Sequence, residues 1–102
     1  MSINTEAIQA SAQRLFPHES LDQVMVELLL ERAQKNLIKY QTAARQFETK
    51  YNQDFETFRH QVLRAQPDFE TEQNYFDWEL AVSGIADMEN EIERLRGLSQ
   101  SL

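Results

Sequence analysis

Between Ser20 and Pro67 the sequence contains neither glycine nor proline, the two residues that most often interrupt a helix. Apolar residues recur across this stretch in alternating steps of four and three, at Val26, Leu30, Ala33, Leu37, Tyr40, Ala44, Phe47 and Tyr51. Heptad spacing of this kind places every member on one side of an α-helix. The pattern therefore predicts one long helix over residues 20–52, of which the part from Leu21 to Tyr51 is about 46 Å long at 1.5 Å per residue.

A second heptad seam lies near the C-terminus, and it predicts a helix over residues 72–97. Tyr75 and Val82 broaden this seam, whose members are Trp78, Ala81, Ile85, Met88, Ile92 and Leu95. Gly84 falls inside the predicted helix, where glycine costs about 1 kcal/mol relative to alanine. We interpret it as a position of close packing against a facing helix. Gly97 is expected to end the helix.

Capping signals mark the ends of the long helix. Ser20 and Gln23 have the spacing of a capping box, in which side chain and backbone satisfy each other at the helix start. Asn52 tolerates the left-handed conformation that follows many helices, so it is expected to end this one. Residues 68–71 are expected to connect to the last helix.

Two short helices complete the prediction. Residues 1–19 form a short N-terminal helix or arm, capped by Thr5 and stopped before Pro17. Residues 54–66 form a connecting helix capped by Asp54.

The composition agrees with an all-α chain of one domain. A length of 102 residues fits a single domain, here residues 1–102, and two glycines with two prolines are too few for the turns of a sheet. Apolar residues make up 41% of the chain, which disfavours disorder. We expect an antiparallel hairpin of two long helices, coiled-coil-like, with a short helix at its N-terminus and another at its bend.

The start of the long helix carries more apolar surface than one seam needs, at Leu21, Val24, Met25, Leu28 and Leu29. Two seams alone bury too little area to offset the chain entropy of folding. The N-terminal helix or a second chain must supply the remainder. We therefore expect a homodimer in which two hairpins form a helical bundle.

The net charge of −7 is concentrated in residues 67–102, which hold nine acidic and two basic side chains. An acidic segment repels nucleic acid and attracts basic proteins, so no nucleic-acid partner is predicted. Pairing of Lys39 or Arg45 with Glu79 or Glu89 across the hairpin is expected. A solvated acidic face is the alternative interpretation.

No catalytic motif is found in the sequence. The chain has no cysteine, which excludes disulfides, thiol catalysis and cysteine-based metal sites. Glu56 and His60 are four residues apart, a spacing that indicates an exposed helix pair more often than a metal site. The sequence contains no glycine-rich phosphate loop and no HExxH motif. We expect a protein that is not an enzyme and uses no cofactor or metal.

The location of the protein is expected to be cytoplasmic. The first residues lack the positive and apolar regions of a signal peptide. The longest apolar stretch, Val24 to Leu30, is interrupted by Glu27 and is too short to cross a membrane.

Residues 40–97 contain three short motifs: Phe-Glu-x-Lys-Tyr at 47–51, Phe-x-x-Phe at 55–58 and Tyr-Phe-Asp-Trp-Glu at 75–79. This arrangement resembles a group of small, all-helical prokaryotic proteins that look like the antitoxin halves of toxin–antitoxin pairs. The chain departs from the group at residues 52–54, where a Gly-Met-Ser-like turn is usual. The resemblance implies a non-catalytic, antitoxin-like interaction module that masks a small basic partner protein, such as a toxin.

A structural or regulatory homodimer without a toxin partner is the alternative function. The candidate partner-binding residues are an aromatic pair and four acids of the last helix, namely Tyr75, Phe76, Asp87, Glu89, Glu91 and Glu93. For the aromatic cluster of Tyr75, Phe76 and Trp78, packing at the bend of the hairpin is the competing interpretation. The residues that it would meet there are Tyr51, Phe55 and Phe58.

Overall fold

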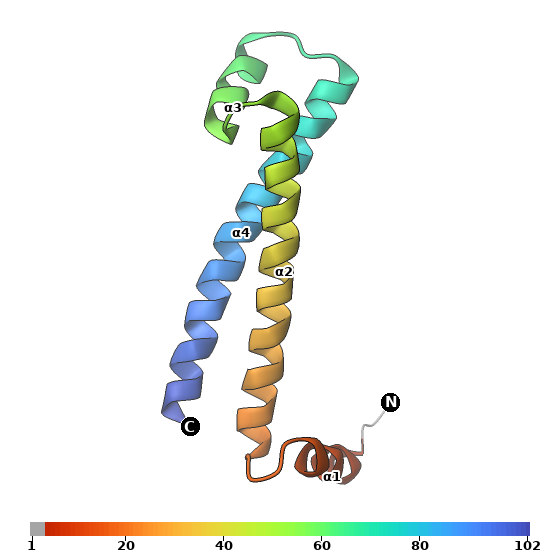
Figure 1. Cartoon of the computed structure of the whole chain (residues 1–102), viewed down its shortest axis with the longest axis vertical. Coiled ribbons are helices and arrows are strands. Elements are labelled where there is room, and N and C mark those ends of the chain that lie inside the picture. The colour runs from red at the N-terminus through yellow and green to blue at the C-terminus, as the bar shows by residue number, and fades with distance from the viewer. Residues whose placement is uncertain (1–3) are drawn as a thin grey trace.

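The computed structural model describes residues 4–102 as four α-helices; the first three residues of the predicted N-terminal arm lie outside that part. The helices are α1 (Thr5–Leu15), α2 (Leu21–Tyr51), α3 (Phe55–Arg64) and α4 (Phe69–Ser101). Helices α2 and α4 run antiparallel, with α3 at the bend that joins them (Figure 1). The predicted all-α hairpin is confirmed. The molecule is elongated, with extents of 58 × 32 × 19 Å.

Helix α1 lies beside the open end of the hairpin, which we call the foot (Figure 1). It is placed on the side of α2 that faces away from α4. Its N-cap is Asn4, whose Oδ1 accepts a hydrogen bond of 3.1 Å from the backbone N–H of Ala7. The prediction that Thr5 caps this helix was therefore wrong by one residue, because the amide of Asn4 reaches the free N–H groups of the first turn.

Both predicted ends of α2 are confirmed. The backbone N–H of Gln23 donates to Ser20 Oγ at 3.1 Å, and the backbone N–H of Ser20 donates to Gln23 Oε1 at 2.9 Å. This reciprocal pair is the predicted capping box. Asn52 follows the last turn in the left-handed conformation, with φ of 52° and ψ of 43°.

Helix α4 is longer at both ends than the sequence pattern predicted. Asp68 is its N-cap, accepting from the backbone N–H of Thr71 at 2.8 Å, so residues 68–71 are not a connecting loop. The helix also continues through Gly97 to Ser101, so the prediction that Gly97 ends it was wrong. A single glycine costs a helix only about 1 kcal/mol, which the surrounding turns offset. Helix α3 is capped by Asp54 as predicted.

The core has two parts along the hairpin. The aromatic core at the bend consists of Ala44, Phe58, Tyr75, Trp78 and Ala81. The foot core is smaller and consists of Ala33, Ile92 and Leu95, with half-buried side chains packed around it. Both predicted heptad seams face this interior, which confirms them. Val82 instead lies at the surface and does not broaden the seam of α4.

Candidate functional site

The two aromatic residues of the predicted partner-binding set lie in different environments. Tyr75 is buried in the aromatic core, where its ring stacks on Phe55 at 5.9 Å between centroids. Its hydroxyl donates to Glu79 Oε2 at 3.1 Å, and burial together with this carboxylate raises the pKa of Tyr75. Phe76, the next residue, has its ring half exposed. Of these two aromatic residues, only Phe76 is exposed enough to contact another molecule.

Trp78 is the centre of the aromatic core. Its side chain is fully buried, and its ring lies 5.2 Å from that of Phe58 and 5.4 Å from that of Phe55. Phe47 and Tyr51 of α2 stack against it at 5.8 and 6.2 Å. The packing interpretation of the aromatic motif is thus confirmed for Trp78 and Tyr75.

Outside its buried seam, α4 carries a row of residues that we call the outer stripe, in which Glu91 is half-buried and the other members are exposed. Its members follow each other in steps of seven and four, namely Phe69, Phe76, Leu80, Asp87, Glu91 and Leu98. Phe69 is 83% exposed, Phe76 51% and Leu80 67%. The half of the stripe near the bend is therefore apolar, and the next part is acidic.

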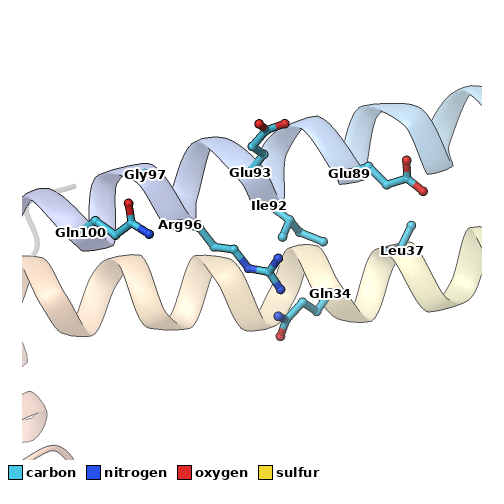
Figure 2. Close-up of a pocket in the computed structure, with 8 residues that line it drawn as sticks. All are labelled: Gln34, Leu37, Glu89, Ile92, Glu93, Arg96, Gly97 and Gln100. Carbon is cyan, nitrogen blue, oxygen red and sulfur yellow. The ribbon is translucent and has the colours of Figure 1, made fainter.

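Glu89 and Glu93 lie on a different side of α4 from Asp87 and Glu91. They border a groove of about 700 Å³ between α2 and α4, whose other walls include Leu37 and Ile92. In Figure 2 the Arg96 side chain extends across this groove toward Gln34, whereas the Glu93 carboxylate points away from α2. The four acids of the predicted site thus form two separate pairs, each spaced i, i+4.

The acids of α4 are hardly neutralised by α2. Among residues 4–102, Lys50 and Glu70 form the one ion pair between the two long helices, at 3.2 Å. The expected pairing of Lys39 or Arg45 with Glu79 or Glu89 is not formed. Glu91 is held within its own helix by Arg94. In the same described part, Asp87, Glu89 and Glu93 have no ion-pair partner.

The histidines lie far apart in the fold. His18 is in the segment before α2, and His60 is in α3. Glu56 is four residues before His60, but its ion-pair partner is Arg59. The distance from Glu56 Oε1 to Arg59 Nη1 is 3.9 Å. Over the described residues 4–102, no cluster of three or more histidine, aspartate or glutamate side chains is arranged to hold a metal ion.

Sequence reasoning missed Phe69 and Leu80, which belong to the same exposed row as Phe76. The signal was present, because Phe69 precedes Phe76 by seven residues and Leu80 follows it by four. The sequence pattern placed residue 69 in a connecting segment, whereas it is the first residue of α4.

A comparison with known proteins finds no match among protein-family models, curated proteins or solved structures. The resemblance to antitoxin-like proteins accordingly stays a prediction. Within residues 4–102, no helix has both the length and the apolar character required to cross a lipid bilayer.

Proposed function

We propose that this chain is a non-catalytic interaction protein that binds a small basic protein through the outer stripe of α4. The observation that carries the proposal is the row of exposed Phe69, Phe76 and Leu80 leading directly into acidic residues on one side of one helix. Exposed aromatic and aliphatic side chains in a row are costly in water and typical of interaction surfaces.

The apolar part of the stripe gives the contact its area. From Phe69 to Leu80 it extends about 16 Å along the helix axis, roughly three turns. Phe76 packs edge-on against the buried Tyr75 at 5.5 Å, so its ring is partly fixed before any partner arrives. A side chain that is already ordered loses less entropy on binding, and this favours Phe76 as the anchor.

The acidic part of the stripe selects the charge of the partner. Asp87 and Glu91 are one helical turn apart, and Glu89 and Glu93 add negative charge on the adjacent side of α4. Like charges at i, i+4 repel each other by a few tenths of a kcal/mol per pair. Arg94 already reduces this repulsion for Glu91, whereas it remains in full between Glu89 and Glu93. Lysine or arginine side chains of a partner relieve this repulsion and accelerate association.

Masking of the partner then follows from occlusion. A helix of 33 residues laid along a basic protein covers the surface that the protein would use elsewhere. This is the mode of action expected of an antitoxin-like protein. It requires no reaction at any side chain of this chain.

The test begins with the tagged full chain, purified from its native host together with any protein that binds it. The recovered partner is then produced separately, and its association and dissociation rates are measured at two salt concentrations. Phe76→Ala with Leu80→Ala should speed dissociation at least tenfold, because both remove central contact area. Asp87→Lys with Glu91→Lys should slow association and weaken its salt dependence.

Two matched variants separate the outer stripe from general charge effects. Glu89→Lys with Glu93→Lys makes the same charge change beside the groove and should slow association without speeding dissociation. Glu6→Lys with Glu48→Lys makes the same charge change on α1 and α2. Of the three charge-reversed variants, it should alter the association and dissociation rates least. Unchanged rates in the Phe76→Ala, Leu80→Ala variant would contradict the proposal.

A further inference from the structure

A second apolar surface lies at the foot of the hairpin, on the opposite end from Phe69 and Phe76. We call it the foot patch; it comprises Met25, Leu28 and Leu29 of α2, and the neighbouring helix α1 adds the exposed Ile8 and Leu15. The three α2 side chains are each 47–54% exposed, and they share one face through spacings of three and four residues. Leu15 is 74% exposed.

Helix α1 covers only part of the apolar face that begins α2. Val24 is buried, although it does not belong to the heptad seam of α2. It lies nine residues before the seam residue Ala33, which places it on the opposite side of the helix. Helix α1 packs on the side of α2 that faces away from α4 (Figure 1), so we infer that α1 is the element that covers Val24. Every side chain of α1 is itself exposed or half-buried, so this short helix both covers Val24 and adds apolar surface of its own.

The foot is the weakly held half of the hairpin. Its core consists of Ala33, Ile92 and Leu95, whereas the bend has the aromatic core. The exposed surface of the whole chain is 7910 Å², about 1,900 Å² more than the roughly 6,000 Å² typical of a folded monomer of 12.0 kDa. A standard interface removes about 800 Å² from each partner. The excess is large enough for such a contact.

The charges that flank the foot patch are self-complementary. Asp22 precedes Met25 along the chain, and Arg32 follows Leu29. Both charged side chains are exposed, and they are symmetric about position 27, which is also the midpoint between Met25 and Leu29. When two α2 helices cross antiparallel at this position, Asp22 of one copy lies opposite Arg32 of the other. Lys35 is already paired with Glu31 of its own helix, at 3.3 Å.

We propose that the foot patch binds a second copy of this chain and forms a homodimer interface. The two copies are related by a two-fold axis near position 27, with α2 of one protomer antiparallel to α2 of its partner. Met25 of each copy then faces Leu29 of the other, and the α1 helices close the two ends of the contact. Each copy supplies the same surface, so the contact is closed and stops at a dimer. It does not involve the outer stripe and is independent of the partner proposed for α4.

The chain has no cysteine, so a single introduced cysteine reports on the geometry of this contact. In the proposed dimer, the two copies of residue 28 are offset by only about 3 Å along the helix axes. The two copies of Ile38, by contrast, are offset by about 33 Å. Leu28→Cys should therefore be joined to its partner by a short bis-maleimide reagent, and Ile38→Cys should not. Ile38 is a matched control, because it is an apolar residue of the same helix and is 61% exposed.

Light scattering on the unmodified chain should give the mass of a dimer at micromolar concentration. Met25→Glu with Leu29→Glu should raise the dimer dissociation constant at least 100-fold, while Ile38→Glu leaves it unchanged. A monomer at high micromolar concentration would overturn the proposal. Equal cross-linking at residues 28 and 38 would also overturn it. A dimer that dissociates in the Leu80→Glu variant but persists in the Met25→Glu, Leu29→Glu variant would do the same. The cross-linking result decides the matter even if the double variant does not fold.

Discussion

Gly84 of α4 lies directly against the ring of Tyr40 of α2. A Cβ atom at residue 84 would be 2.6 Å from Cδ1 of Tyr40 and 2.7 Å from Cδ2 and Cε1. These distances are well inside van der Waals contact, so the ring occupies the space that a side chain would need. The close-packing interpretation of Gly84 is confirmed, and this contact sets how near the two long helices approach each other midway along the hairpin.

We expect Gly84→Ala to destabilise the protein by about 1–3 kcal/mol, because overpacking outweighs the better helix propensity of alanine. Gly97→Ala is the matched control in the same helix. Among residues 4–102 nothing lies within 4 Å of its added Cβ, so this change should stabilise by up to about 1 kcal/mol. Urea unfolding followed by circular dichroism measures both. In a Tyr40→Ala background, the cost of Gly84→Ala should disappear; if it persists, Tyr40 is not its cause.

Trp78→Ala should destabilise the protein by about 3–5 kcal/mol, because it empties the centre of the aromatic core. Trp78→Phe should cost much less. Within the described residues, the buried Nε1 of Trp78 has no hydrogen-bond acceptor, and phenylalanine removes that unsatisfied donor. Thermal and urea melts test both variants, with the surface change Phe76→Ala as a control expected to stay within about 0.5 kcal/mol. A shift of only a degree or two for Trp78→Ala would contradict the packing described.

Asn52→Ala should destabilise the protein by about 1 kcal/mol, because Asn52 has a φ of 52° that a Cβ-bearing residue other than asparagine adopts at a cost. Asn52→Gly should be neutral or stabilising, since glycine enters this conformation freely. Chemical unfolding of the two variants side by side gives the comparison. Equal stabilities of the alanine and glycine variants would show that the left-handed cap is not maintained in solution.

The stability of the protein should fall in acid through the two aspartate caps. The hydrogen bonds from Thr57 and Thr71 lower the pKa of Asp54 and Asp68, respectively, below the ordinary value of 3.8. Because the folded-state pKa is the lower one, this stabilisation is present above the unfolded pKa and is lost as the pH falls through the folded pKa. Melting temperatures measured between about pH 5 and pH 2 should decline as these caps become protonated.

The double variant Asp54→Asn, Asp68→Asn keeps both caps without their charge, and its melting temperature should depend less on pH in this range. Glu27 acts in the opposite direction, because the nearby Glu19 carboxylate raises its pKa. Glu27→Gln should therefore steepen the acid decline, since it removes a repulsion that protonation otherwise relieves. If the unmodified chain, the double variant and Glu27→Gln had the same pH dependence of the melting temperature, these pKa shifts would not be the cause of the acid decline.

The sequence by itself determined the helices and the sides that they bury. Steps of three and four identify one side of a helix without any neighbour, because each residue turns the helix by 100°. Caps such as Ser20, Asp54 and Asn52 are likewise local, because the side chain or backbone of one residue serves the nearest turn. These two kinds of signal were sufficient to predict the hairpin.

Only the tertiary structure decided what covers each of the remaining sides. It places Tyr75 in the core and Phe76 in the solvent, and it separates Glu89 and Glu93 beside the groove from Asp87 and Glu91 on the outer stripe. It also shows that Val24 is buried while Met25 and Leu29 stay exposed. Periodicity tells which residues of one helix lie together, but exposure depends on where a second helix packs. That position is set by contacts between residues far apart in the chain, such as Tyr40 with Gly84 and Lys50 with Glu70.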